Sequence, residues 1–199
     1  MSWVTFDGRA DAKKEKMSGK GAKIFKEATM RNRLKILWAI TFIGLGLATT
    51  SSSFSAEIVS FGGYPTGTIV VKTSQRHLYY VVADGRAIRY PVGVGRAGMK
   101  WSGTASIDGK YIKPAWSPPD MIRRENPRIP DVIASGSPGN PMGAAALTLS
   151  GGGQYAIHGT NNPQSVGRFV SHGCIRMYNS DVLDLYDRVS FGTPVVVLP

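Results

Sequence analysis

Short apolar runs rich in β-branched and aromatic residues follow one another after residue 65, and they set the fold class. Two of them, His77–Val82 and Arg86–Val92, meet across Asp84-Gly85, and an Asp-Gly pair between apolar runs is a strong hairpin signal. No regular alternation of strands with helices is present, so the sequence predicts a mainly β domain. Further strands are expected at Thr68–Lys72, Thr104–Ile107, Tyr155–Ile157 and Thr193–Leu198.

One segment near the C-terminus has helical rather than strand periodicity. Asn179 or Ser180 can cap its start, and Gly192 lies beyond its end. We therefore expect one clear helix after the only cysteine. Its apolar positions at helical spacing are Val182, Leu183, Leu185, Tyr186 and Val189.

The stretch from His158 to Met177 holds the only cysteine, Cys174, and two of the three histidines. A thiol attacks a carbonyl carbon only as the thiolate, and an ordinary cysteine, with a pKa of about 8.5, is only slightly ionised at neutral pH. An imidazole can take that proton and later return it to a leaving amine. His172 shares a face with Cys174 if the segment is extended, whereas His158, at the end of a predicted strand, must be brought in by folding.

Other interpretations of these residues stay open. A single cysteine is usually a small buried hydrophobic residue, and a single histidine is usually structural. The polar, glycine-flanked run from Ser171 to Cys174 is a poor core sequence, however, and an unpaired cysteine in an exported protein indicates a reactive thiol. Zinc bound by His158, His172 and Cys174 is a further alternative, but no CxxC or HExxH spacing accompanies them. We therefore expect a nucleophilic cysteine and no metal or cofactor.

The motif HGT at His158, followed by SHGCIRM at residues 171–177, resembles the signature of the L,D-transpeptidases of the YkuD domain family, enzymes that cross-link bacterial peptidoglycan. The family's upstream pattern is similar to Gly139–Gly143 and Leu147–Leu149. The resemblance covers residues 66–199 and implies a β-sandwich-like catalytic domain with the cysteine in a cleft. The family's downstream pattern resembles Asp181, Leu185-Tyr186 and Gly192–Val196.

The resemblance also implies a reaction. Cys174 would attack the carbonyl that joins the third residue of a donor stem peptide to a terminal D-alanine, and an amine on a second stem would then resolve the thioester. Water in place of that amine would make the enzyme a carboxypeptidase, and an envelope protein is an alternative acceptor. A wall-binding domain without activity is a third possibility. The resemblance further implies acylation of Cys174 by carbapenems.

The family assigns the general base to the histidine at His158, with His172 and Gly173 shaping the surroundings of the nucleophile, although spacing alone favours His172. Backbone amides near Gly173 and Cys174 are the natural donors to an oxyanion. Ser171 is expected to orient an imidazole through a hydrogen bond.

Two further residues are expected to bind substrate. Arg176 can hold a carboxylate in bidentate fashion, and the alternative for it is an ion pair with Asp181 or Asp184. Trp116 lies in a long proline-rich stretch, and long loops inside a domain are usually functional. It is expected either to wall the substrate cleft or to plug the core beneath the loop.

The N-terminal residues carry more than half of the formal charge of +11, since residues 1–56 contribute +6 and residues 57–199 contribute +5. Residues 1–29 are predicted to be a disordered basic segment or an over-extended start. Residues 30–56 run from basic through apolar to small residues, the order of a secretory signal peptide, and the apolar run Ile36–Ala48 is short for a membrane span. The alternative is a cytoplasmic tail with an uncleaved anchor.

These features predict an exported protein of the periplasm or cell wall that touches the membrane only through its signal segment. Residues 57–65 form a lead-in, residues 66–199 form the catalytic domain, and no second domain or repeat is present. A charge of +5 fits attraction to an anionic envelope polymer. No clustered basic stripe or nucleic-acid-binding module is present, so nucleic acid is excluded as a partner.

Overall fold

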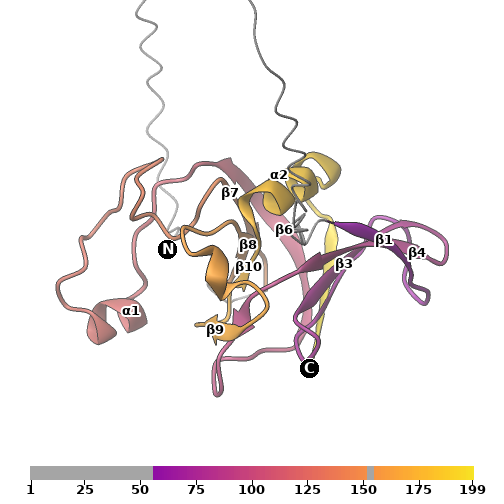
Figure 1. The fold of residues 1–199 in the computed structure, drawn as a ribbon, viewed down its shortest axis with the longest axis horizontal. Coiled ribbons are helices and arrows are strands. Elements are labelled where there is room, and N and C mark those ends of the chain that lie inside the picture. Colours follow the sequence, from indigo (N-terminus) through magenta and orange to yellow (C-terminus); the bar gives the residue numbers. More distant parts are fainter. Residues whose placement is uncertain (1–55, 152–154) are drawn as a thin grey trace, which may run out of the picture. The chain divides into compact units, whose positions relative to one another are not determined.

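The computed structural model describes residues 56–151 and 155–199, in which nine strands form one sheet in the order β1-β4-β3-β2-β11-β6-β7-β8-β10 (Figure 1). The segments predicted at 1–29 and 30–56 lie outside these residues except for Ala56. The strands of the sheet are β1 Glu57–Ser60, β2 Ile69–Lys72, β3 His77–Ala83, β4 Arg86–Pro91, β6 Gly103–Ile112, β7 Ala145–Leu149, β8 Ala156–His158, β10 Ile175–Arg176 and β11 Pro194–Leu198.

The long strand β6 joins the two halves of this sheet. Residues 103–106 pair with β11, and residues 107–112 pair with β7 beyond a register shift between Ile107 and Gly109. An irregularity of this kind bends a strand and increases its twist. Figure 1 shows β6 as a long curved strand with β1, β3 and β4 on one side and β7, β8 and β10 on the other. The mainly β, sandwich-like fold class is thereby confirmed.

The main core contains apolar side chains from both halves of the sheet and from the helix α2. Full burial of a side chain such as Val, Leu or Ile contributes about 1.5–3 kcal/mol to the free energy of folding, relative to leaving it exposed. Tyr90 is the largest of them, and its hydroxyl donates a 2.5 Å hydrogen bond to Oδ2 of Asp184, so its one polar atom is satisfied. Other members are Ile69, Leu78, Ile107, Leu147, Ile157, Val182 and Leu185.

The predicted helix is α2, Asn179–Arg188, which buries Val182 and Leu185 against the sheet. The prediction of its cap was wrong, because Tyr178 occupies the N-cap position and no side chain caps the first turn. The stretch predicted to be irregular contains a short helix, α1 Asp120–Glu125, and the other helical turn is the 3-10 turn η1 Pro163–Ser165. No helix in the described ranges is long and apolar enough to cross a bilayer.

The side chain of Asn179 joins three elements instead of capping the helix. Its Oδ1 accepts 3.0 Å hydrogen bonds from the amides of Ala144 and Thr160, and its Nδ2 donates to the Thr160 carbonyl at 3.1 Å. Gly159 lies so close to Oδ1 that a Cβ at this position would overlap it. Asn179 therefore fixes the end of β8, which carries His158, to the first turn of α2.

We expect Asn179→Ala to lower the free energy of unfolding by about 3 kcal/mol, because three hydrogen bonds contribute about 0.5–1.5 kcal/mol each. Chemical denaturation followed by fluorescence measures this loss. Ser180→Ala is the matched control, since the Ser180 hydroxyl contacts only the adjacent Asp181 within the described ranges. Equal losses in the two variants would contradict the role given to Asn179.

Candidate active site

The parallel pairing of β8 with β10 brings the two parts of the motif together. Arg176 lies opposite His158 and Ile175 lies opposite Ile157 in the register of these strands. Because side chains alternate between the faces of a strand, Arg176 and His158 share a face. Cys174 immediately precedes β10 in the chain, so folding closes the sixteen-residue separation between Cys174 and His158.

A second pairing fixes the other side of the motif. The two-stranded sheet of β5 Val94–Gly95 and β9 Phe169–Ser171 leads directly into the loop that carries the cysteine. Gly93 and Arg176 also exchange two backbone hydrogen bonds of 2.8 Å. The two strands that flank the cysteine loop, β9 and β10, are therefore each paired with a neighbouring strand.

A cavity of about 490 Å³ opens at this point, and it is lined by His158, Ser171, His172, Cys174 and Arg176. The structure thus gathers most of the predicted site residues around one space; Gly173 does not line it. Gly98, Met99 and Lys100 also line the cavity. An apolar wall comes from the connection between β6 and β7, through Trp116, Pro119, Met121, Ile122, Pro141 and Met142.

Cys174 is half-buried and lines this cavity. Burial raises the pKa of the thiol above its ordinary value, and a backbone hydrogen bond at Ala156 and the charge of Arg176 oppose this rise only in part. At neutral pH the resting cysteine is therefore the uncharged thiol.

His158 is 2% exposed, and its Nδ1 lies 2.6 Å from the carbonyl oxygen of Gly159. A carbonyl only accepts hydrogen bonds, so Nδ1 carries the proton and Nε2 is the nitrogen with a lone pair. The pKa of His158 is lowered to about 4, chiefly by burial and next by the positive charge of Arg176, while the backbone groups of Gly159 and Pro141 oppose this decrease. The imidazole is therefore neutral at pH 7.

His172 lines the same cavity but has different partners. Its Nε2 lies 2.8 Å from Oε2 of Glu125 and 3.0 Å from Nη2 of Arg96, and Arg96 and Glu125 form a 2.5 Å ion pair. Hydrogen bonds from His172 and Arg96 hold the pKa of the Glu125 carboxyl below its usual range. His172 therefore links the cysteine loop to α1.

The sequence did not indicate a role for Arg96 or Glu125. The two residues lie 29 positions apart, and Glu125 is 47 positions from His172. No pattern within one element could indicate the contact, because it depends on where the β6–β7 connection is placed in the fold.

Ser171 braces the cysteine loop instead of orienting an imidazole as expected. Its hydroxyl donates to the Cys174 carbonyl at 2.6 Å and accepts from the Gly173 amide at 3.1 Å. Gly173 has φ of +118°, a left-handed conformation that favours glycine. A Cβ at this position would also overlap the ring of Tyr155. Both features restrict residue 173 to glycine.

Arg176 has no ion pair among the described residues, and its buried Nε has no hydrogen-bond partner there. The alternative of a pair with Asp184 is wrong, because that carboxylate is bound by Arg188 and Tyr90. Asp181 likewise has a buried Oδ2 without a partner. Arg176 lines the cavity, and no described carboxylate forms an ion pair with it.

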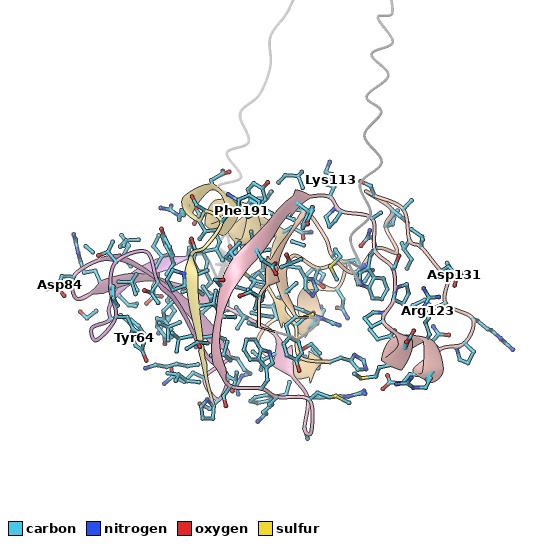
Figure 2. The ribbon with its side chains drawn as sticks, turned by 180° about the vertical axis from the view of Figure 1, so that it is seen from behind. Tyr64, Asp84, Lys113, Arg123, Asp131 and Phe191 are labelled. Atoms are coloured by element: carbon cyan, nitrogen blue, oxygen red, sulfur yellow. The ribbon has the colours of Figure 1, made fainter. Side chains whose placement is uncertain are left out.

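Trp116 combines the two roles proposed for it as alternatives. Its side chain is 5% exposed and packs with Met142 and Ala146, yet it also lines the cavity. Its backbone exchanges hydrogen bonds of 2.9 and 2.8 Å with Ile133. Figure 2 shows Arg123 and Asp131, which form an ion pair, on the same β6–β7 connection. Trp116 is thus the apolar anchor of a wall with its own internal contacts.

Within residues 56–151 and 155–199, no group of three or more His, Cys, Asp or Glu side chains has an arrangement that could hold a metal ion.

The family model described as the L,D-transpeptidase catalytic domain, YkuD, matches residues 66–197. The chain belongs to the YkuD family. This match confirms the resemblance drawn from the HGT and SHGCIRM motifs. The YkuD domain contains both strands that hold the site, β8 and β10, and the whole β6–β7 connection.

Individual relatives agree with this assignment. The probable L,D-transpeptidase ErfK/SrfK of Escherichia coli (strain K12) is 37% identical over 139 residues, which is 65% of this chain and 43% of that protein. The chain thus spans less than half the length of this curated relative.

Solved structures show the same fold. A protein described as a probable carnitine operon oxidoreductase, caia, from Brucella melitensis is 40% identical, with a TM-score of 0.50, over 75% of this chain and 96% of that one. The Ldtfm-avibactam carbamoyl enzyme is 20% identical, with a TM-score of 0.52, over 68% of this chain and 50% of that one. The latter shares the fold of the YkuD domain.

The lowered pKa of His158 predicts a pH-dependent stability. The unfolded chain takes up a proton near pH 6.5 and the folded chain only near pH 4, so the stability present above pH 6.5 is lost as the pH falls through this interval. This loss amounts to about 3 kcal/mol between pH 7 and pH 4. Denaturation at a series of pH values should show that His158→Gln lacks this part of the pH dependence.

His77→Gln is the control for that measurement. Burial also lowers the pKa of His77, but this ring is only half-buried, so the variant should lose a smaller part of the pH dependence. If His158→Gln loses stability toward acid as steeply as the unmodified protein, His158 is not held neutral by the fold.

Proposed function

We propose that the chain is a cysteine acyltransferase, an L,D-transpeptidase that forms peptidoglycan cross-links or attaches protein to peptidoglycan through a thioester on Cys174. The observation that carries the proposal is the shared cavity, in which an uncharged thiol lies with a buried imidazole whose Nε2 can accept a proton. Membership of the YkuD family supports the same reaction.

The first half of the reaction forms the acyl-enzyme. Nε2 of His158 takes the proton of the Cys174 thiol as Sγ bonds to the carbonyl carbon of the donor stem peptide. The tetrahedral intermediate then breaks its C–N bond, and the imidazolium returns the proton to the nitrogen of D-alanine. Because the pKa of the thiol is raised and that of the imidazole is lowered, proton transfer accompanies attack instead of preceding it.

The second half consumes the thioester. An amine on a second stem peptide, or on an envelope protein, attacks the carbonyl and loses its proton to His158. The C–S bond breaks, and Cys174 regains its proton from the imidazolium. Water in place of the amine gives hydrolysis, so the apolar wall around Trp116 and Met142 favours transfer by limiting access of water.

One backbone amide is assigned to the oxyanion. The Gly173 amide donates to Ser171. The Cys174 amide belongs to the nucleophilic residue itself, and we assign the oxyanion to it. Removing a donor of this kind costs on the order of 3 kcal/mol in the transition state.

The peptide partners are proposed to be stem peptides that carry carboxylates, with Arg176 as the group that binds them. Its guanidinium lines the cavity without an ion pair among the described residues. We also propose export to the periplasm or cell wall, which the order of basic, apolar and small residues in 30–56 supports.

Incubation of the protein with purified stem tetrapeptides and an acceptor amine, followed by mass analysis, tests the function. We expect loss of D-alanine, a thioester on Cys174 and a cross-linked product. Cys174→Ser should abolish product formation, and His158→Gln should lower the rate about 100-fold or more. His172→Gln should lower it less, since that ring is bonded to Glu125.

The outcomes separate the competing functions. Hydrolysis of the tetrapeptide to tripeptide without any cross-linked product, even with excess acceptor, would identify a carboxypeptidase. Binding to murein sacculi without any turnover would identify a wall-binding domain. Acylation of Cys174 by imipenem, seen as a mass increase of the intact protein, would support acyl transfer over the oxidoreductase activity in the name of the Brucella melitensis protein.

Arg176→Gln should raise the KM for the donor peptide about 10-fold to 100-fold, because a hydrogen bond to a charged group contributes about 1.5–3 kcal/mol. Steady-state kinetics with stem tetrapeptide measures the effect. Arg176→Lys keeps the positive charge beside His158 but loses the bidentate geometry. It should therefore raise the KM while changing kcat less than Arg176→Gln does. Arg86→Gln, at an exposed position on β4, is the control. An unchanged KM in Arg176→Gln would remove Arg176 from the binding site.

A further inference from the structure

Trp101 binds the backbone of the cysteine loop from outside the cavity. Its indole Nε1 donates a 3.0 Å hydrogen bond to the carbonyl oxygen of Gly173, 72 positions along the chain. The indole is stacked on the ring of Tyr155, with centroids 4.8 Å apart and an interplanar angle of 4°. Trp101 is half-buried and does not line the cavity. The indole is therefore held in place by one ring and aimed at one carbonyl.

The Gly173 carbonyl belongs to the peptide unit that ends in the Cys174 amide. This unit is trans, since no cis peptide occurs among the described residues, and in a trans peptide the C=O and N–H bonds point in opposite directions. A partner that fixes the direction of the Gly173 carbonyl therefore also fixes the direction of the Cys174 N–H. In the proposed function, the Cys174 N–H is the group that donates a hydrogen bond to the oxyanion.

The hydrogen bonds of Ser171 lie on either side of this peptide unit. Ser171 binds the Gly173 amide and the Cys174 carbonyl, which lie in the peptide units on either side. The absence of a side chain at Gly173 gives the central unit rotational freedom that other residues lack, although Tyr155 packs closely against it. The hydrogen bond from Trp101 to the central carbonyl therefore favours one orientation of this unit over others.

We propose that Trp101 is a positioning residue for the reaction, which aims the Cys174 amide at the oxyanion through its hydrogen bond to the Gly173 carbonyl. The inference rests on the proposed function, because it assumes that an acyl-enzyme forms on Cys174. It assigns Trp101 no contact with substrate.

Two reactions of the same thiol test the proposal. Acylation by imipenem passes through an oxyanion, whereas alkylation by iodoacetamide does not. In Trp101→Phe, which keeps an aromatic ring against Tyr155 but has no N–H, we expect acylation to slow about 10-fold to 100-fold. The alkylation rate should stay within about twofold, because a positioning role at the amide leaves the proton transfer to His158 intact. Stopped samples analysed by intact-protein mass spectrometry give both rates.

Tyr80→Phe is the matched control, because the Tyr80 hydroxyl also donates a 3.0 Å hydrogen bond to a backbone carbonyl, that of Arg188. Its acylation and alkylation rates should both be unchanged. If Trp101→Phe does not fold, replacing Trp101 by β-(3-benzothienyl)alanine removes the N–H with almost no change in ring shape.

Equal rates of acylation in the Trp101 variant and the unmodified protein would overturn the proposal, and so would equal losses in acylation and alkylation. These results differ from a failure of the proposed function. In that case the unmodified protein itself would be alkylated by iodoacetamide but would give no acyl-enzyme with imipenem or with stem tetrapeptide.

Discussion

The pairing of two very short strands, β8 and β10, is the contact on which the site depends. β10 has two residues and β8 has three, so few hydrogen bonds connect them directly. Their register is nevertheless fixed, because Ile157 and Ile175 are both fully buried on the core face and a shift of one residue would expose them. The apolar core therefore sets the distance between the thiol and the imidazole.

Burial also sets the chemical state of the two catalytic candidates. A low-dielectric environment disfavours the thiolate of Cys174 and the imidazolium of His158 together. An uncharged pair at rest differs from the preformed ion pair of a strongly activated thiol. The uncharged thiol of Cys174 should therefore react slowly with electrophiles in solution and faster with a carbonyl carbon that is held beside it in the cavity.

The sequence predicted the parts of this protein that local patterns encode. The Asp84-Gly85 hairpin joins β3 and β4 as expected, the helical periodicity after residue 179 corresponds to α2, and the YkuD motifs identified the family. Chain position also indicated that His158 ends a strand. Each of these features depends on residues close together in the chain.

The contacts that were not predicted join distant positions. The Glu125–His172 hydrogen bond forms only when the β6–β7 connection folds back toward the cysteine loop. Asn179 can bond to the residues at the end of β8 because Gly159 has no side chain that would overlap it. Ser171 was assigned to an imidazole because a sequence shows which groups can form hydrogen bonds but not which partner is nearest. Asp184 does not pair with Arg176, because Arg188, one helical turn away, binds that carboxylate.

The shared strand β6 has a consequence for how the domain unfolds. One continuous strand pairs with β11 through residues 103–106 and with β7 through residues 107–112, so unfolding of β6 in one half removes support from the other half. The halves should therefore melt in a single cooperative transition, as small two-state domains do. A destabilising substitution far from the cysteine, on β2 or β3, would reduce the fraction of folded molecules without altering the turnover rate of those that stay folded.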